Sequence, residues 1–488
     1  MFKQYSILLF LFLGIYSILP DQKRQELLEK LTRKMYNDND RMVEQKSQDM
    51  KFNNLGNNID YNISQVDEII KKYDFPKNYN FFKDNDITPN VKNQEQCGGC
   101  WSFAATSALA YRFEKKYGNF CILNYIYKII FKIYYILYME SDKIKVLVTG
   151  VTGFLGSRIA NSLLEQNYLV RGTVRSLKNK DKLYPINSLP HQENLELIEA
   201  DLLKEEDWDK AVSGCKYVLH VASPFPTKSP KNENDLINPA VKGTTSILKA
   251  VSNHKEIKHV VITSSIAAIM HTYHNHKKEY DENDWPDIKY IIPYNKSKTL
   301  AEKSAWDFYN KLKQENKLTF KLTTICPGYI FGPSLIKTDF SSGSIIKQIM
   351  MGELLGIPKL YMPIVDVRDV AIAHIKAMES DITDGNRYIC TSDDGFWASD
   401  ISNLIKKEYG KFGYKPTTLN VPYFACWAAS WLDGQAASAC SMWGCDGKFK
   451  NDKIKKDLGL TFISGKEAIL KMIESLIEFG IIPNLIKK

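Results

Sequence analysis

Three side chains in two segments of the sequence have the chemistry needed for proton transfer. In PYNKSKTLAEKSAWDFY, Tyr294 and Lys298 are four residues apart, and the apolar segment HVVITSS ends in Ser264 and Ser265. Positions four apart share one face of a helix. A phenol has a pKa of about 10, so an ammonium that favours the phenolate would suit it to acid–base work at neutral pH. We predict that Ser265, Tyr294 and Lys298 are catalytic and that Lys298 lowers the Tyr294 pKa.

A glycine-rich turn forms a second candidate site. In IKVLVTGVTGFLGSRIANSLLEQN an apolar strand pattern leads into Gly150, Gly153 and Gly156 and then into a helical pattern. The first glycine permits a tight turn, the second lets the main chain approach a pyrophosphate, and the third lets the helix pack closely. Phosphate would then lie at the positive end of the helix. We expect a dinucleotide here, contacted also by Phe154 and Leu155.

The end of the second expected strand distinguishes the two nicotinamide dinucleotides. An acidic residue there would bind the ribose hydroxyls of NAD. This chain instead has Arg175, with Lys178, Lys180 and Lys182 just beyond. Guanidinium groups match phosphate geometry, so Arg175 and Lys182 favour NADP(H) over NAD(H). A solvated basic loop is the alternative interpretation.

Regular alternation of strand and helix patterns begins after Met139. The apolar strand segments are 144–149, 168–174, 195–200, 216–222 and 259–265. Strands separated by helices indicate βαβ units and a parallel sheet. The predicted fold class is therefore α/β, a Rossmann-type doubly wound parallel sheet with a smaller C-terminal substrate lobe over 139–488. After the third strand, Asp201 and Leu202 could reach the adenine, or Asp201 could cap the next helix.

Length and composition limit the function classes. With 488 residues, 44% of them hydrophobic, the chain can form two units. Its net charge of +9 comes from lysines scattered among acidic residues, which does not indicate a nucleic-acid partner. Six of the nine cysteines fall after Met139 without a disulfide pattern, which suggests a cytosolic compartment for that part. We expect no metal site, and interpret the histidines at 271, 274 and 276 as a solvated loop.

The first 138 residues have a different organisation. Residues 1–20 resemble a signal peptide in length and charge, and residues 21–73 are polar and propeptide-like. A protease-like fragment follows over 74–120. The apolar junction over 121–138 contains Lys128 and Lys132, whose burial in a bilayer would cost several kcal/mol. Membrane association is expected only if this junction inserts.

From Met139 to about Ile482, the sequence resembles an extended short-chain dehydrogenase/reductase of the NAD-dependent epimerase/dehydratase family. The similarity is to its dihydroflavonol reductase and cinnamoyl-CoA reductase group. Its marks, in family order, are VTGVTGFLG, TVRS, HVASP, VVITSS, YNKSK, CPGYIFGP and VDVRDVAIAH. The resemblance implies that Tyr294 protonates a carbonyl oxygen, that Ser265 hydrogen-bonds it, and that Lys298 holds the nicotinamide ribose.

The same resemblance implies further cofactor contacts. Pro327, Gly328 and Ile330 match positions that line the nicotinamide, and Ala222 and Ser223 match the turn beside the cofactor ribose. After the serine-ended strand, TSSIAAIM departs from the small or polar residues usual in the family. Its bulkier Ile266 and Met270 leave the acceptor pocket undefined.

The stretch VKNQEQCGGCWSFAATSALAYRFEKKYG resembles the start of a papain-family cysteine protease. The resemblance places Cys100 at the nucleophile position and Gln94 at the oxyanion position. Such an enzyme needs a downstream histidine base and an orienting asparagine. His254 and His259 lie at a suitable sequence distance, but they flank a reductase-like strand, so we interpret them as structural or surface residues. We expect no protease activity.

The favoured function is reduction of an aldehyde or ketone of aromatic or otherwise apolar character, with NADPH, by a monomer or homodimer. An NAD-dependent sugar-nucleotide epimerase or hydroxysteroid dehydrogenase is the alternative enzyme. From another class, the chain could be a cofactor-binding regulator, or an inactive protease remnant with a passenger reductase. Residues 1–120 could be a truncated protease gene joined to a reductase. The reductase part is then cytoplasmic, whereas a genuine fusion would enter the secretory pathway.

Overall fold

The computed structural model describes residues 143–488, apart from 224–231, 273–275, 338–339, 432–433 and 487–488. The predicted signal-like segment, polar region, protease-like fragment and apolar junction lie outside the described residues. The same holds for Gln94 and Cys100. The organisation predicted for these segments stays a prediction.

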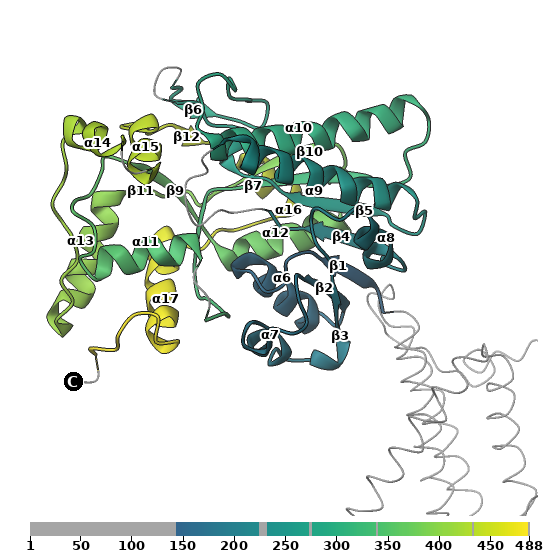
Figure 1. The fold of residues 1–488 in the computed structure, drawn as a ribbon, viewed down its shortest axis with the longest axis horizontal. Coiled ribbons are helices and arrows are strands. Elements are labelled where there is room, and N and C mark those ends of the chain that lie inside the picture. Colours follow the sequence, from purple (N-terminus) through teal and green to yellow (C-terminus); the bar gives the residue numbers. More distant parts are fainter. Residues whose placement is uncertain (1–142, 224–231, 273–275, 338–339, 432–433, 487–488) are drawn as a thin grey trace, which may run out of the picture. The chain divides into compact units, whose positions relative to one another are not determined.

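A parallel sheet of seven strands forms the centre of the described protein (Figure 1). Its order is β10-β7-β5-β4-β1-β2-β3, and every neighbouring pair is parallel. The strands are β1 (Lys145–Val148), β2 (Leu169–Val174), β3 (Leu195–Glu199), β4 (Tyr217–His220), β5 (His259–Thr263), β7 (Lys321–Pro327) and β10 (Asn386–Cys390). From β1 the chain runs outward to β3 and then returns to β4 on the other side. This switch point is where doubly wound sheets bind ligands, and the predicted Rossmann-type fold is confirmed.

Helices cover both faces of this sheet (Figure 1). Val146 and Val148 of β1 pack into one hydrophobic cluster, and Leu147 between them packs into another. The first cluster includes residues of α6 (Phe154–Glu165), α7 (Lys180–Asn187), α12 (Val367–Glu379) and α16 (Asp452–Leu458). The second includes residues of α8 (Glu206–Val212), α9 (Asn234–Ser252) and α10 (Pro293–Gln314). Burial on both faces explains why the strand segments are almost continuously apolar.

A smaller lobe lies beside the sheet (Figure 1). Its sheet has the order β11-β9-β8, formed by β8 (Tyr329–Phe331), β9 (Tyr361–Asp366) and β11 (Gly395–Trp397). Its helices are α11 (Ser341–Met350), α13 (Ala398–Tyr409), α14 (Tyr423–Ala429), α15 (Gly434–Ser441) and α17 (Gly465–Glu478). A separate pair joins β6 (Glu279–Tyr280) to β12 (Lys448–Phe449), and short 3-10 helices include η3 (Ile266–Ala268). The lobe has its own core, formed by residues such as Phe331, Ile364 and Met472.

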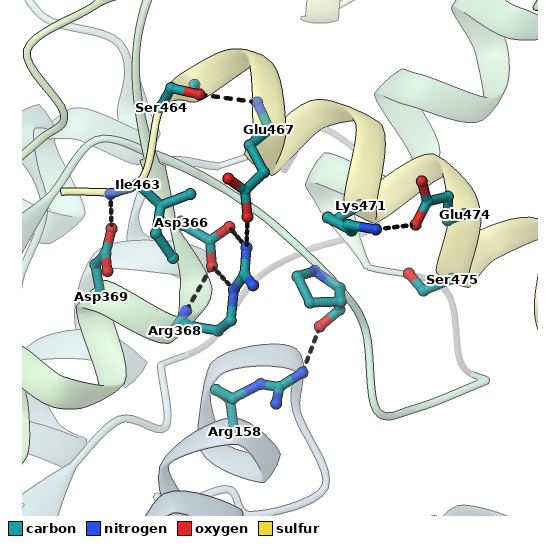
Figure 2. Close-up of polar contacts among 12 residues, drawn as sticks. Arg158, Asp366, Arg368, Asp369, Ile463, Ser464, Glu467, Lys471, Glu474 and Ser475 are labelled. Carbon is teal, nitrogen blue, oxygen red and sulfur yellow. Dashed lines mark hydrogen bonds and ion pairs between the residues drawn. The ribbon is translucent and has the colours of Figure 1, made fainter.

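Polar contacts between α12 and α17 strengthen the attachment of the lobe to the sheet domain (Figure 2). Asp366 is fully buried and caps α12 by accepting a hydrogen bond from the Arg368 backbone at 2.8 Å. The Arg368 guanidinium returns to Asp366 at 2.8 Å and reaches Glu467 of α17 at 3.1 Å. Arg158 of α6 donates to the Pro333 carbonyl at 2.8 Å. The motif VDVRDVAIAH thus joins the end of β9 to the C-terminal helix.

Within the described ranges, no helix combines the length and the apolarity that a membrane crossing requires. The apolar junction over 121–138 lies outside those ranges.

Candidate active site

The glycine turn brings α6 against the end of β1. Gly150 has a φ of +67°, a conformation that side chains disfavour. A Cβ at Gly156 would lie 2.3 Å from the Gly150 carbonyl oxygen, so only glycine fits there. The Gly153 amide donates to the same oxygen at 2.9 Å, and α6 begins at the next residue, Phe154. Without side chains at these positions, the turn leaves a main-chain cradle at the start of a helix, which fits a dinucleotide phosphate.

Two threonines that the sequence analysis did not select hold this turn. The Thr173 hydroxyl accepts a hydrogen bond from the Gly150 amide at 3.0 Å. The Thr149 hydroxyl accepts from the amides of Val221 and Ala222, both at 2.9 Å. The glycine turn and the turn after β4 therefore form one unit. The position of Thr149 directly before the first glycine was the available sequence signal.

The predicted catalytic serine and tyrosine come together. Ser265 follows the end of β5 in an extended conformation and accepts a hydrogen bond from the Ala267 amide at 3.1 Å. Pro293 begins α10, which places Tyr294 in the first helical turn. The Tyr294 and Ser265 side chains share a hydrogen bond. The first turn of α10 thus faces the carboxyl end of β5, which lies inside the seven-stranded sheet.

The Tyr294 pKa differs from the sequence expectation. Burial raises it to about 12, and the hydrogen bond with Ser265 opposes that rise. The net pKa is therefore raised rather than lowered as predicted, because desolvation of the phenolate dominates. Burial also raises the pKa of Tyr329 of β8 to about 12, and the charge of Tyr294 adds to that rise. Tyr294 consequently holds its proton at neutral pH, as an acid must.

Lys298 lies one turn after Tyr294 on α10. Burial lowers its pKa to about 8, and the negative charge of Glu302 opposes that shift. His220, at the end of β4, faces Lys298: burial and the Lys298 charge together lower the His220 pKa to about 3. Lys298 is therefore largely protonated at neutral pH, whereas His220 is neutral.

A pocket connects several of the predicted residues. Its lining residues come from the ends of β4 and β5, from α9 and α10, and from the turns that follow the strands: Leu202, His220, Ala222, Ser223, Pro239, Ala240, Gly243, Thr244, Ile262, Thr263, Ser264, Lys298, Ala301 and Glu302. The structure thus places the predicted cofactor contacts Leu202, Ala222 and Ser223 in the same pocket as Lys298.

The predicted adenine-side residues lie at the surface. Arg175 directly follows β2 and is exposed, and Lys182 is exposed in the first turn of α7. The Asp201 carboxylate accepts a hydrogen bond from the Leu203 amide at 2.9 Å. Helix α8 begins only at Glu206 and has no side-chain cap, so Asp201 does not cap it. The capping alternative for Asp201 is therefore wrong.

The segment expected beside the nicotinamide joins two sheets. Pro327 ends β7, Ile330 lies in β8, and Gly328 connects them. A Cβ at Gly328 would lie 2.3 Å from the carbonyl oxygen of Pro363, which is why the turn needs glycine. The bulky Ile266, in contrast, packs into a core cluster with residues that include Tyr280 and Phe449.

The histidines have structural contacts. His254 contacts the carboxylates of Asp209 and Glu256, each at 3.0 Å. His259 is buried and shares a 2.8 Å hydrogen bond with Thr323. These contacts agree with a structural role for both. In the described part of the chain, no group of three or more His, Cys, Asp or Glu side chains could hold a metal ion.

The sequence around this site matches a known protein family. Residues 147–419, more than half of the chain, match the 3-beta hydroxysteroid dehydrogenase/isomerase family. The chain belongs to this family. Among curated members, dihydroflavonol 4-reductase of Arabidopsis thaliana is 34% identical over 356 residues, which cover 71% of this chain and 85% of the relative. Tetraketide alpha-pyrone reductase 1 of Arabidopsis thaliana is 36% identical over 263 residues, covering 52% and 78%.

Solved structures agree with the family assignment. The NADPH complex of yeast methylglyoxal/isovaleraldehyde reductase Gre2 has a TM-score of 0.57 at 26% identity, covering 69% of this chain and 99% of that protein. The NADPH complex of Gre2 from Candida albicans has the same TM-score and coverage at 30% identity. The predicted resemblance to a short-chain reductase is confirmed. Residues 75–123 match the papain family of cysteine proteases, which confirms the second predicted resemblance.

Proposed function

We propose that residues 139–488 form an NADPH-dependent reductase of an aldehyde or ketone of aromatic or otherwise apolar character. The observation that carries the proposal is the hydrogen bond between Tyr294 and Ser265, with Lys298 one turn away beside the cofactor pocket. The family members compared above are named as reductases, which supports the direction of the reaction.

The proposed chemistry divides between the cofactor and the chain. NADPH, when bound, would supply a hydride to the carbonyl carbon. Tyr294, protonated at neutral pH, would donate its proton to the carbonyl oxygen, and Ser265 would hydrogen-bond that oxygen. The Lys298 ammonium would stabilise the phenolate left behind and hold the nicotinamide ribose. The product would be an alcohol, so the enzyme would act on the CH–OH and carbonyl pair.

Several residues would hold the cofactor. The cradle around Gly150, Gly153 and Gly156 would bind the pyrophosphate, with Phe154 and Leu155 in the first turn of α6 beside it. The exposed guanidinium of Arg175 would pair with the 2′-phosphate of NADPH. Structures of two relatives are NADPH complexes, which supports this choice of dinucleotide.

The test is NADPH oxidation by the full chain with a panel of aromatic aldehydes and ketones. Tyr294→Phe removes only the proton donor. Turnover by the natural chain that falls about 10²- to 10⁴-fold in Tyr294→Phe, with NADPH affinity retained, is the expected result. Tight NADPH binding without turnover on any carbonyl would contradict the proposal and favour a cofactor-binding regulator.

A hydroxysteroid dehydrogenase or epimerase that uses NAD is the second candidate, favoured by the family to which residues 147–419 belong. The same Ser265, Tyr294 and Lys298 would serve it. The discriminating measurements are cofactor preference and product analysis with 3β-hydroxysteroids and sugar nucleotides. A preference for NAD with turnover of either class would replace the first proposal.

We propose that the first 138 residues are an inactive protease remnant. The proposal rests on the predicted order of their segments: a signal-like segment, a polar region, a protease-like fragment and an apolar junction. Labelling with a cysteine-protease probe is expected to leave Cys100 unmodified, because the sequence downstream is reductase-like and its histidines have no protease-like sequence around them. Detection of one polypeptide with peptides from both parts would support a genuine fusion, and with it entry into the secretory pathway. Two separate polypeptides would place the reductase part in the cytoplasm.

A further inference from the structure

A buried carboxylate lies directly behind the proposed catalytic residues. Glu302 follows Lys298 by four residues on α10, so the two side chains share one face of the helix. Glu302 is only 2% exposed, yet it lines the same pocket as Lys298 and Ser264. An ionised carboxylate at such a depth requires charged and hydrogen-bonding partners.

Arg387 of β10 is the principal partner of Glu302. Its Nε donates to one carboxylate oxygen at 2.7 Å and its Nη2 to the other at 3.2 Å. The guanidinium is held from its other sides as well: Nη2 donates to the Ala268 carbonyl at 3.0 Å, and the plane stacks on the Trp285 ring at 3.6 Å. These contacts hold the Arg387 guanidinium in place against the Glu302 carboxylate.

Two hydroxyl groups and one indole N–H also donate to the carboxylate, besides the Cys326 thiol at 3.9 Å. Thr324 of β7 donates to Oε1 at 2.8 Å, and Trp306 on the next turn of α10 donates to the same atom at 3.2 Å. Ser264 donates to Oε2. Ser264 is the residue immediately before Ser265, so Glu302 is one hydrogen bond and one peptide unit away from the serine that contacts Tyr294. The carboxylate therefore connects α10, where Tyr294 and Lys298 lie, to the end of β5.

We propose that Glu302, clamped by Arg387, is a positioning residue of the active site that keeps Lys298 protonated and fixes the end of β5. The inference rests on the proposed catalytic function of Ser265, Tyr294 and Lys298. Glu302 makes no contact with the reacting atoms in this account and acts through its neighbours.

The charges around Lys298 explain why Glu302 matters. From β4 Lys298 faces the neutral His220, from β7 the Cys326 thiol, and from its own helix Glu302. Burial holds the Lys298 pKa near 8, and the charge of Glu302 is the larger of the two effects that oppose it. The Cys326 thiol is neutral at the pH values of this experiment, because burial and the Glu302 charge both raise its pKa above the ordinary value of a thiol. Glu302 is thus the charged group that favours the Lys298 ammonium.

Glu302→Gln tests the proposal through the pH profile of kcat/KM. Loss of the Glu302 charge should lower the Lys298 pKa by about one unit. The alkaline limb of the profile, where kcat/KM declines as Lys298 loses its proton, should then move to lower pH by the same amount. For a shift from about 8 to about 7, the protonated fraction falls roughly eightfold at pH 8.5 but less than about 1.5-fold at pH 6.5. A merely structural role would reduce the rate by the same factor at both pH values, and that outcome would overturn the inference.

A second variant guards against misfolding, because Glu302→Gln leaves Arg387 buried without a counter-charge. In the double variant Glu302→Gln/Arg387→Gln both charges are removed, which buried pairs often tolerate better. The double variant should have the same displaced alkaline limb. If the folded double variant has its alkaline limb at the same pH as the natural protein, the Glu302–Arg387 pair only stabilises the fold, and the inference is wrong.

Asp366→Asn is the matched control. It removes a fully buried carboxylate from another arginine pair, Asp366 with Arg368 (Figure 2). It should lower thermal stability and leave the alkaline limb in place. Displacement of the limb in this control as well would overturn the inference, because any broken ion pair would then produce the effect.

Acetylation of Lys298 by acetic anhydride, followed across pH by peptide mass spectrometry, gives a readout that needs no turnover. The midpoint of labelling should fall by about one unit in Glu302→Gln. An unchanged midpoint would contradict the inference, even if turnover falls. Should the natural chain reduce no carbonyl at all, the proposed function fails while this labelling experiment still decides the role of Glu302.

Discussion

The sheet domain and the C-terminal lobe contribute different kinds of residues. On the sheet side, the ends of strands and helices position each candidate residue: Gly150 follows β1, Ser265 follows β5 and Tyr294 lies at the start of α10. On the lobe side, α14 and the residues directly after it expose aromatic rings: Trp427 in the helix is 50% exposed, and Trp431, two residues beyond its end, is 75% exposed. The difference teaches that residue spacing predicts the residues proposed to contact the cofactor, whereas the exposed aromatic residues of the lobe follow no fixed spacing from which an acceptor could be predicted.

Among substitutions that test this comparison between sheet domain and lobe, Lys298→Met should have the largest effect on turnover. Turnover should fall about 10²- to 10⁴-fold on every acceptor, because both the ribose contact and the stabilisation of the phenolate are lost. The free energy of unfolding at pH 7 should rise by about 1–3 kcal/mol. Kinetics and urea denaturation measure the two effects.

The sign of the stability change follows from the lowered pKa of Lys298, about 8 in the folded protein. Between about 8 and the unfolded value of about 10.4, the unfolded chain binds more protons, so the natural chain gains stability as pH rises. Below pH 8 the full cost of burying the ammonium is present, and methionine removes it. A loss of stability in Lys298→Met at pH 7 would contradict the burial of this charge.

Gly156→Ala should have the next largest effect. The alanine Cβ would lie 2.3 Å from the Gly150 carbonyl oxygen, and this backbone atom cannot move away without distorting the turn. We expect a stability loss of about 1–3 kcal/mol and weaker NADPH binding, measured by denaturation and fluorescence titration. Gly410→Ala is the control, since its Cβ would meet nothing closer than 3.9 Å. Equal effects of the two substitutions would mean that the turn is not tightly packed.

Arg175→Asp should affect the choice of cofactor alone. Loss of a charged hydrogen bond to the 2′-phosphate should weaken NADPH binding about 10- to 100-fold and leave NADH binding equal or better. Lys255→Asp, an exposed site with the same charge change, serves as the control in the same titrations. Unchanged NADPH affinity in Arg175→Asp would assign the arginine to a solvated loop.

The smallest effect on the protein itself is expected from Trp431→Ala in the lobe. An exposed side chain contributes little to folding, so the free energy of unfolding should change by less than about 0.5 kcal/mol. NADPH affinity should also stay the same, whereas KM for an aromatic acceptor should rise. A KM unchanged across the acceptor panel would argue against a contact between the acceptor and the segment after α14, and would weaken the comparison between the two regions.

The sequence predicted the sheet well because its strands are buried on both faces and appear as nearly continuous apolar segments. The spacing of its three glycines also located the glycine turn, and the structure shows the close packing that requires a glycine at Gly156. The small sheet of β8, β9 and β11 was not predicted, since its strands are short and come from distant parts of the chain.

The network behind the site was also missed. Glu302 lies at the same four-residue spacing after Lys298 that marks Lys298 after Tyr294, so a signal existed for the carboxylate. Nothing in the sequence connects it to Arg387, 85 residues further on. The Tyr294 pKa was predicted in the wrong direction, because spacing reveals the neighbouring ammonium but not the degree of burial.

Hydride transfer itself is the most direct test of the proposed reductase. NADPH carrying deuterium at C4 should be incubated with the full chain and an aromatic aldehyde, and the product analysed by mass spectrometry. Reduction predicts deuterium on the carbinol carbon of the alcohol, with the yield lost in Tyr294→Phe. An unlabelled product, or the same labelled yield with Tyr294→Phe, would contradict the mechanism.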